Sequence, residues 1–398
     1  MILLKLLCFH LVAISPIFTE TIYDVTKYGA DNKARSLMTV AVQKAIDIAA
    51  TRGGGTIYFP PGQYISGPIR LRSNIDVHFA DNVVITWTYD ERKYPPLKMH
   101  SDEGGWQLKN TPLLYAYGEK NITIRGRGKL EGQGSHWWPK YNSASDRPSF
   151  LVFFGIHNLV LEDFTVQNSP CMNIRVIRCR QVMIKGVTIY NPYNGHNTDG
   201  INSYSTNDLV VNGVTISTGD DCISLDSGTK YPSSNILITN SHMNWGHAGV
   251  CIGGAILGGL KNITVTNTIF NGTDRGLYIK ARRGLGNVVD NVNYSNITMN
   301  NILKEGIVLS MLYDENHQDA ALHDKNIKWI PFRNDTPVYR NIRYNGVRGT
   351  SKLNPIFIVG LPESHIINVD MKNINVKSSQ PVSVTNAKNV VIDGKRYA

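Results

Sequence analysis

Residues 235–238 read Asn-Ile-Leu-Ile, and residues 262–265, one repeat later, read Asn-Ile-Thr-Val. Each stretch places a polar turn residue before a short strand of alternating apolar side chains. The same unit begins at six positions: Asn121, Asn158, Gln181, Asp208, Asn235 and Asn262. The last three steps between these positions are equal, which indicates an internal repeat, and the repeat determines the architecture.

The equal steps are 27 residues long. A repeat of this length, with short strands and no helix, predicts one rung of a parallel β-helix. A single rung cannot bury its apolar face, whereas stacked rungs enclose a continuous core. Leucine-rich repeats have a similar length, but their Leu-x-x-Leu-x-Leu pattern is absent here. The polar residue that opens each unit would lie at equivalent turns, so its side chain is expected to stack as a ladder.

A helix is expected ahead of the rungs. Apolar residues recur at helical spacing within residues 37–52, Ser36 is a candidate N-cap, and Gly53 to Gly55 would end the helix. We expect this helix to cap the first rung, where unpaired strand edges would otherwise attract other chains. No linker is evident, so residues 21–398 are expected to form one β-helix catalytic domain.

Residues 1–20 resemble a signal peptide. Lys5 supplies a positive charge, and residues 6–18 form an apolar stretch that is too short to span a membrane. We therefore expect the protein to be secreted and extracellular.

The composition favours a globular chain with a basic surface. Only 18% of residues are charged, which argues against a highly charged disordered chain. Lys and Arg outnumber Asp and Glu by 41 to 31, so the overall charge suits a polyanionic partner. No nucleic-acid fingerprint and no basic run of five residues are present.

Loss of the signal peptide removes Cys8 and leaves four cysteines, Cys171, Cys179, Cys222 and Cys251. Their spacing fits no zinc template, and both disulfides and buried free thiols remain open. Six Asn-x-Ser/Thr sequons are candidate glycosylation sites in a secreted protein. They begin at Asn121, Asn262, Asn271, Asn293, Asn296 and Asn334.

Four polar clusters fall on the repeat grid, at residues 197–199, 219–221, 246–247 and 278–280. Residues one rung apart should lie roughly 4.8 Å apart, the spacing of neighbouring strands. The step from Asp220 to His247 equals the repeat, the step from Asp199 to Asp220 is shorter, and the step from His247 to Lys280 is longer by a loop. The sequence therefore predicts that these groups converge on one outer face, although each alone could be an ordinary turn or surface residue.

Asp220 and Asp221 would point to opposite faces of a regular strand. Both can reach one cleft only at a strand end or a bulge, which Gly219 would permit. Carboxylates clustered in this way resist ionising together, so at least one pKa should rise. Glycoside hydrolysis needs such a pair, with one protonated acid and one carboxylate that activates water. Calcium would need six to eight oxygen ligands, which His247 and Lys280 fit poorly, so no metal is expected.

Asn-Thr-Asp at 197–199, Gly-Asp-Asp at 219–221 and Gly-His at 246–247 resemble, in order and spacing, the signatures of polygalacturonases, glycoside hydrolase family 28. The N-terminal segments 28–30 and 53–62 are similar to the same group and to related β-helix enzymes. The resemblance implies an all-β fold, a single-stranded right-handed parallel β-helix with an N-terminal capping helix. It also implies hydrolysis of α-1,4-galacturonosyl bonds in pectin with inversion and without a cofactor.

The resemblance also implies roles for individual residues. Asp220 would be the general acid, and Asp199 with Asp221 would hold and deprotonate the water. His247 would support the protonation of Asp220 or orient it. The expected partner is a polyanionic pectic polysaccharide, with no nucleic acid, no membrane and a monomeric protein.

The expected substrate-binding residues are Asn197, Lys280, Tyr278 and Arg282, with Lys280 binding a substrate carboxylate and Asn197 ordering the site. Tyr278 stands where the family usually has Arg, so a bidentate carboxylate clamp is lost. Arg282, Arg283 or Arg275 is a candidate to replace it.

A second departure is Ala248, which stands where the family usually has Gly after the histidine. Ala is harmless there unless the backbone needs a positive φ or a close approach.

The sequence leaves two other functions open and disfavours a third. One is a rhamnogalacturonan or xylogalacturonan hydrolase of the same family, and another is a catalytically weak pectin-binding relative, which the loss of Arg at 278 would permit. A pectate lyase is disfavoured, since β-elimination typically recruits calcium. Whether hydrolysis is endo or exo depends on whether loops close one end of the cleft, and segments 90–118 and 312–340 are long enough to do so.

Overall fold

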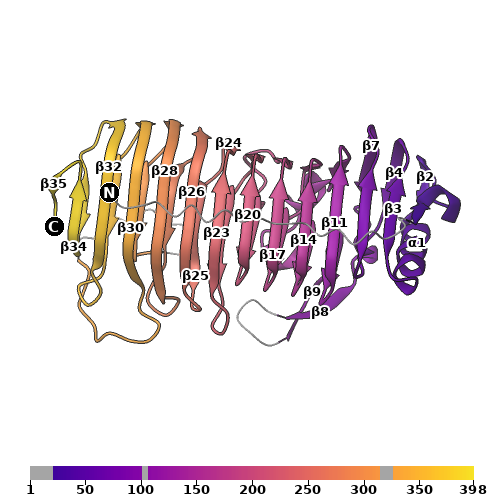
Figure 1. Ribbon diagram of the computed structural model, residues 1–398, viewed down its shortest axis with the longest axis horizontal. Coiled ribbons are helices and arrows are strands. Elements are labelled where there is room, and N and C mark those ends of the chain that lie inside the picture. The colour runs from indigo at the N-terminus through magenta and orange to yellow at the C-terminus, as the bar shows by residue number, and fades with distance from the viewer. Residues whose placement is uncertain (1–20, 101–105, 314–325) are drawn as a thin grey trace, which may run out of the picture.

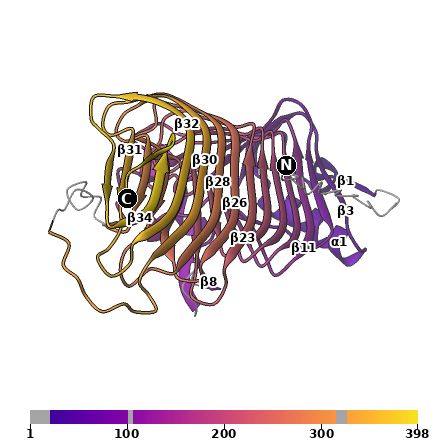
Figure 2. The same ribbon diagram turned by 60° about the vertical axis from the view of Figure 1, so that its left-hand side comes forward.

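The computed structural model describes residues 21–100, 106–313 and 326–398, so the expected signal peptide at 1–20 lies outside the described residues. The chain forms a single-stranded right-handed parallel β-helix, as predicted. Its rungs follow one another along the long axis of the molecule (Figure 1), and the view in Figure 2 shows successive strands stacked in register.

One face of the β-helix is an eleven-stranded sheet to which each rung contributes one strand. Its neighbouring strands pair in parallel, for example Ile201 with Ile223 and Ile223 with Val250. In chain order the strands are β5 (Ile69–Arg70), β10 (Leu114–Tyr117), β13 (Leu151–Phe154), β16 (Ile174–Ile177), β19 (Ile201–Tyr204), β22 (Ile223–Ser227), β25 (Ala248–Ile256), β27 (Arg275–Lys280), β29 (Ile307–Ser310), β31 (Ile356–Val359) and β33 (Ser383–Thr385).

The rest of each rung runs through a 22-stranded sheet, first as two short strands and, from β26 to β32, as one long strand, and the sheet ends with the short antiparallel pair β34 and β35. Its strands are β1 (Ile22–Asp24), β2 (Lys33–Leu37), β3 (Gly55–Phe59), β4 (Gly62–Ser66), β6 (Ile75–Phe79), β7 (Val83–Trp87), β11 (Lys120–Gly126), β12 (Lys129–Glu131), β14 (His157–Glu162), β15 (Thr165–Gln167), β17 (Arg180–Lys185), β18 (Thr188–Tyr190), β20 (Asn207–Asn212), β21 (Thr215–Ser217), β23 (Ser233–Thr239), β24 (His242–Met243), β26 (Leu260–Asn271), β28 (Val288–Ile302), β30 (Val338–Ser351), β32 (Ile366–Ser378), β34 (Ala387–Ile392) and β35 (Lys395–Arg396).

The predicted capping helix is present as α1 (Thr39–Thr51), and it lies at the N-terminal end of the stack (Figure 1). The predicted N-cap at Ser36 is wrong, because Ser36 belongs to β2 and α1 begins after Met38 without a side-chain cap. The reason is pairing with β4: Leu37 lies opposite Ile65, and the backbone N–H of Met38 donates to the carbonyl of Ile65 at 2.8 Å.

The core is a column of stacked aliphatic side chains inside the rungs. Val182 pairs with Leu209, Leu209 with Ile236 and Ile236 with Ile263, and each is at most 2% exposed. Burying a side chain of this size stabilises the fold by roughly 1.5–3 kcal/mol. The repeat unit found in the sequence is therefore the unit that fills the core.

The predicted ladder of polar turn residues is also present. Asn235 and Asn262 both adopt left-handed backbone conformations, with φ of 59° and 58°, which Asn tolerates better than most residues. The amide of Asn262 donates to the side-chain oxygen of Asn235 at 3.1 Å and accepts from Asn291 at 3.0 Å. The ladder therefore fixes the same turn in successive rungs.

Three features lie outside the two large sheets: the antiparallel hairpin β8 (Pro96–His100) and β9 (Trp106–Asn110), the short helix α2 (Gly134–Trp137), and the 3₁₀ turns η1 (Val25–Tyr28), η2 (Glu91–Lys93) and η3 (Ala144–Asp146). The four cysteines of the described chain are buried free thiols, which settles the alternative that the sequence left open. Within the described residues, no helix is long and apolar enough to cross a membrane.

Candidate active site

Asp220 and Asp221 lie in a bend just before β22 begins at Ile223. The strand-end position predicted from their adjacency is confirmed, because neither residue takes part in the regular alternation of the strand. Gly219 is required here, since a Cβ atom at this position would lie 2.2 Å from the carbonyl oxygen of Gly195. The bend can therefore pack tightly against the preceding rung.

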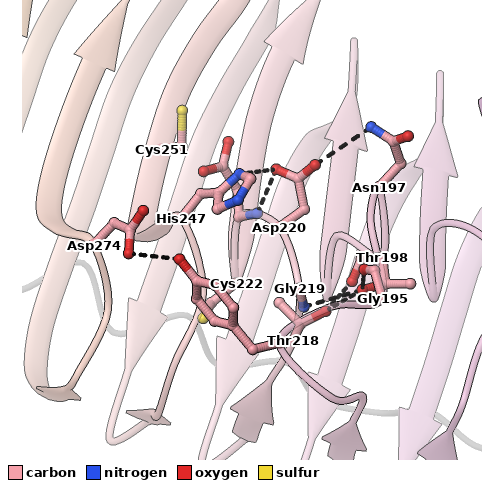
Figure 3. Close-up of polar contacts among 12 residues, drawn as sticks. Gly195, Asn197, Thr198, Thr218, Gly219, Asp220, Cys222, His247, Cys251 and Asp274 are labelled. Carbon is pink, nitrogen blue, oxygen red and sulfur yellow. Dashed lines mark hydrogen bonds and ion pairs between the residues drawn. The ribbon is translucent and has the colours of Figure 1, made fainter. Parts of the chain in front are cut away.

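The preceding rung holds Asn197 to Asp199 in a matching turn, and Thr198 joins the two turns (Figure 3). The hydroxyl of Thr198 donates to the carbonyl of Gly195 and accepts from the backbone N–H of Gly219 at 3.0 Å. Thr218 also donates to Thr198. The hydrogen bonds of Thr198 hold Asp199 and Asp220 on neighbouring rungs at one edge of the eleven-stranded sheet.

The backbone register extends this edge over further rungs. Gly200 donates to the carbonyl of Asp221 at 3.0 Å, which aligns Asp199 with Asp221. His247 donates its backbone N–H to the carbonyl of Asp220 at 2.9 Å. The structure thus brings together the three carboxylates and the imidazole that the sequence placed on one face.

Both oxygens of Asp220 have partners. Its Oδ1 accepts from the backbone N–H of Asp221 at 2.8 Å and lies 3.2 Å from Nδ1 of His247. Its Oδ2 accepts from Nδ2 of Asn197 at 3.5 Å (Figure 3). The Asn197 amide is oriented by Arg147, whose guanidinium donates to Asn197 Oδ1 at 2.7 Å.

The pKa values of Asp199 and Asp220 are shifted in opposite directions. Burial, together with the charges of Asp220 and Asp221, raises the pKa of Asp199 well above its usual value. Burial would also raise the pKa of Asp220, but the hydrogen bond and the charge of His247 hold it below the usual value. One retained proton is therefore shared by the pair, with the pKa of Asp199 raised and that of Asp220 lowered.

His247 is the cation of this pair. Burial opposes its charged form, but the hydrogen bond to Asp220 and the charges of Asp220, Asp221 and Asp274 raise its pKa to about 9. A protonated His247 next to Asp220 stabilises the Asp220 carboxylate, so at rest it opposes protonation of the acid. Both roles expected for His247, support of protonation and orientation of Asp220, stay predictions.

Lys280 lies at the far end of β27, and its side chain reaches back to the carboxylates. Its Nζ donates to Asp221 Oδ2 at 2.9 Å, with the two side chains 10% and 5% exposed. Burial would lower the pKa of Lys280, but the charge of Asp221 raises it well above its usual value. The ammonium also lies 4.9 Å from the ring centre of Tyr313 and 5.3 Å from that of Tyr278.

Tyr278 does not provide a carboxylate clamp. Its ring is 7% exposed and packs in a small apolar cluster with Ala248, Cys251 and Phe357. Ala248 fits without strain, because it lies in β25 and is absent from the residues with positive φ. Tyr278 is thus a buried side chain that packs next to Lys280.

The arginines proposed to compensate for Tyr278 are placed differently from one another. Arg275 forms an ion pair with Glu305 at 2.8 Å, and Arg283 forms one with Glu363 at 2.6 Å. Arg282 is partly exposed just beyond β27, where a contact with substrate stays a prediction. Neither Arg275 nor Arg283 is therefore held ready for a substrate carboxylate.

Four residues of the site were missed by the sequence reading: Arg147, Tyr193, Asp226 and Asp274. Asp274 follows His247 by the same step that separates His247 from Asp220, so the repeat itself contained this signal. Asp226 follows Asp221 along β22, and burial raises its pKa to about 6. Arg147 and Tyr193 lie outside the strands and carry no repeat signal.

Within the described residues, no group of three His, Cys, Asp or Glu side chains has the geometry of a metal site. The carboxylates instead have cations and amides as neighbours: Lys280 at Asp221, and His247 with Asn197 at Asp220. Such a set can hold a proton, orient a water molecule and bind an anionic sugar.

Several known proteins are similar to this chain in sequence. A probable polygalacturonase from Arabidopsis thaliana is 30% identical over 264 residues, which is 63% of this chain and 55% of that protein. This chain thus spans about half the length of that relative. An exopolygalacturonase from Zea mays is 28% identical over 335 residues, covering 79% of this chain and 76% of that protein.

The solved structure of an exopolygalacturonase from Thermotoga maritima covers 92% of both chains with a TM-score of 0.79 at 22% identity. A polygalacturonase from Erwinia carotovora covers 93% of this chain and 96% of its own, with a TM-score of 0.72 at 22% identity. At these identities the two structures show the fold.

Two family models match the sequence. The one described as "Rhamnogalacturonase A/epimerase, pectate lyase-like" matches residues 22–78, and the one described as "Glycosyl hydrolases family 28" matches residues 62–393. Because the second match covers most of the chain, the protein belongs to glycosyl hydrolases family 28.

Proposed function

We propose that this protein is a secreted polygalacturonase that hydrolyses α-1,4-galacturonosyl bonds of pectin with inversion. The observation that carries the proposal is the meeting of Asp199, Asp220 and Asp221 with Lys280 at one edge of the eleven-stranded sheet. Relatives named as polygalacturonases or galacturonosidases in plants and bacteria support the substrate class.

The mechanism assigns a proton and a water molecule to opposite sides of the glycosidic bond. Asp220 protonates the leaving oxygen, while Asp199 and Asp221 hold the water and take up its proton. An inverting enzyme leaves roughly 6.5–9.5 Å between its acid and its base for that water. Residues splayed over two rungs and a bend suit such a gap better than two directly stacked carboxylates.

The acid must be protonated when it acts, yet the pKa of Asp220 is lowered while that of Asp199 is raised. Asp199 and Asp220 are coupled, so one retained proton belongs to the pair. Transfer of this proton to Asp220 when substrate enters would supply the acid and leave Asp199 as a base. A galacturonate carboxylate that binds Lys280 would draw the ammonium away from Asp221 and free Asp221 Oδ2 to accept a hydrogen bond from the water.

The decisive experiment measures new reducing ends from polygalacturonate with the protein and with its Asp220→Asn variant. We expect hydrolysis by the wild type, at least 100-fold less by the variant, and equal thermal stability within about 1 kcal/mol. Full activity of Asp220→Asn would reject the acid assignment. Proton NMR of the first product tests inversion, since the α bond should yield a β-anomer.

Parallel assays separate the related functions. Higher activity on rhamnogalacturonan or xylogalacturonan than on polygalacturonate would identify a different substrate within the family. Binding to polygalacturonate without any product would indicate a pectin-binding relative, which the buried Tyr278 makes worth testing. A time course that begins with monomer indicates exo action, whereas a ladder of oligomers indicates endo action.

A further inference from the structure

His247 has a carboxylate on the rung that follows it as well as on the rung that precedes it. Asp274 donates its backbone N–H to the carbonyl of Gly246 at 2.8 Å, and Arg275 donates to the carbonyl of His247 at 3.0 Å. Asp274 therefore occupies the position next to His247 in the stack, and it is 6% exposed. Figure 3 shows His247 between Asp274 and Asp220 in that view.

Asp274 is held by a residue from a distant part of the chain. The hydroxyl of Tyr193 donates to Asp274 Oδ1 at 2.9 Å across a separation of 81 residues. Tyr193 lies in the loop that leads to Asn197, and its ring meets the His247 ring edge-on with centres 6.3 Å apart. The loop before the first catalytic turn is thereby tied to the start of β27, with His247 beside the tie.

We propose that Asp274, fastened by Tyr193, is a positioning residue that flanks the His247 imidazole and keeps it turned toward Asp220. The proposal rests on the proposed function, because it concerns how the catalytic acid is oriented. Asp274 acts through His247 and is assigned no contact with the substrate.

The charges around His247 support this role. The carboxylates that raise its pKa are Asp220, Asp221 and Asp274, and they lie on the rungs of β22 and β27 on either side. A carboxylate neighbour on each side favours the imidazolium form and restricts the orientation of the ring. Tyr193 stays neutral, because burial and the bond to Asp274 raise its pKa to about 12.

Lys304 provides an opposing charge from the following rung. Its backbone N–H donates to the carbonyl of Asp274 at 2.7 Å, and its Nζ lies 3.4 Å from Asp274 Oδ2. This ammonium partly neutralises Asp274 as seen from His247. Removing Asp274 and removing Lys304 should therefore change His247 in opposite directions.

The test follows the titration of His247 by NMR in full-length protein with ¹⁵N-labelled histidine, and a His247→Gln variant assigns the signal among the 11 histidines. We expect Asp274→Asn, which keeps the size and can still accept from Tyr193, to move the midpoint to lower pH by about one pH unit. Tyr193→Phe should move it in the same direction by less, and Lys304→Gln should move it to higher pH. An unchanged midpoint in Asp274→Asn would overturn the proposal.

Hydrolysis of polygalacturonate is the second readout. In Asp274→Asn we expect a lower kcat with a nearly unchanged KM, and an alkaline limb of the pH profile that moves with the His247 midpoint. A variant that loses only thermal stability while both midpoints stay fixed would show a merely structural role and overturn the proposal. Because the NMR titration needs no turnover, an inactive wild type would reject the proposed function and leave the positioning role to be judged by NMR.

Discussion

The asparagine ladder of the 22-stranded sheet and the carboxylate edge of the eleven-stranded sheet, formed by Asp199, Asp220 and Asp221, are stacked by the same rungs but differ in what they stack. In the ladder, Asn262 donates to one neighbour and accepts from the other while it remains exposed and uncharged. At the carboxylate edge, Asp199 and Asp221 are 7% and 4% exposed and repel one another. Amides gain from a spacing of ~4.8 Å, whereas like charges need cations between them.

This difference indicates which buried charge destabilises the fold. Lys280 and His247 compensate Asp221 and Asp220, while Asp199 has no ion-pair partner among the described residues. The ladder stabilises the register, and the carboxylate edge makes use of that register at a cost in stability. Substitutions in the two regions should therefore have effects of different sign and size.

The largest effect is expected from breaking the buried ion pair of Lys280 and Asp221. Lys280→Met leaves Asp221 without its cation, and removal of one partner from a buried pair costs about 3–5 kcal/mol. Urea unfolding at pH 7 should show this loss together with loss of hydrolysis. The matched double variant Lys280→Met/Asp221→Asn should recover much of the stability but none of the activity. A loss below ~1 kcal/mol in the single variant would contradict the burial of this pair.

A smaller loss is expected in the ladder. Asn262→Ala removes two side-chain hydrogen bonds and places a residue that disfavours the left-handed region at φ 58°, so we expect a loss of about 1–3 kcal/mol. Asn262→Gly keeps the backbone freedom and should lose less. Thermal unfolding compares the two variants, and their hydrolysis should match the wild type. Equal stability of both variants would show that the left-handed turn carries no energetic cost.

A gain in stability is expected when the carboxyl of Asp199 is removed. Because the pKa of Asp199 is raised in the folded protein, the native state is destabilised once pH exceeds the unfolded value of roughly 3.9. Asp199→Asn should therefore be more stable than the wild type at pH 7, by the ~0.5–2 kcal/mol common for single stabilising changes, and inactive. The two proteins should unfold alike near pH 3.5. A variant that is less stable at pH 7 would show that Asp199 is stabilised by its surroundings.

The ladder and the core were predictable from the sequence because they repeat. Each unit begins with a residue such as Asn235 and continues with inward apolar residues such as Ile236, so spacing alone gives their stacking. The carboxylate edge was predictable in part, since the spacing of Asp220 and His247 equals the length of the repeat. Lys280 was placed on the correct face, although it reaches the site from the far end of its strand.

The remaining parts of the site depend on contacts that no period encodes. Arg147 and Tyr193 come from loops, and they meet Asn197 and Asp274 only after the rungs have stacked. The expected cap at Ser36 failed because tertiary pairing with β4 extended a strand through it. The sequence also did not show which carboxyl has the raised pKa, since this follows from which carboxylate lies next to His247.

The smallest effect concerns the pH range of the His247–Asp220 pair. The pKa of His247 rises from roughly 6.5 in an unfolded chain to about 9 in the fold, so its stabilising effect is complete below pH 6.5 and disappears as pH passes 9. The lowered pKa of Asp220 sets the acid side, where the pair is lost as the carboxyl protonates.

His247→Gln should therefore be less stable than the wild type at pH 6 and equal to it at pH 10. Since the His247 side chain is 39% exposed, solvent screening limits the difference to under ~1 kcal/mol. Unfolding curves at the two pH values measure this difference, and a gap that persists at pH 10 would mean that His247 stabilises the fold by packing and not by charge.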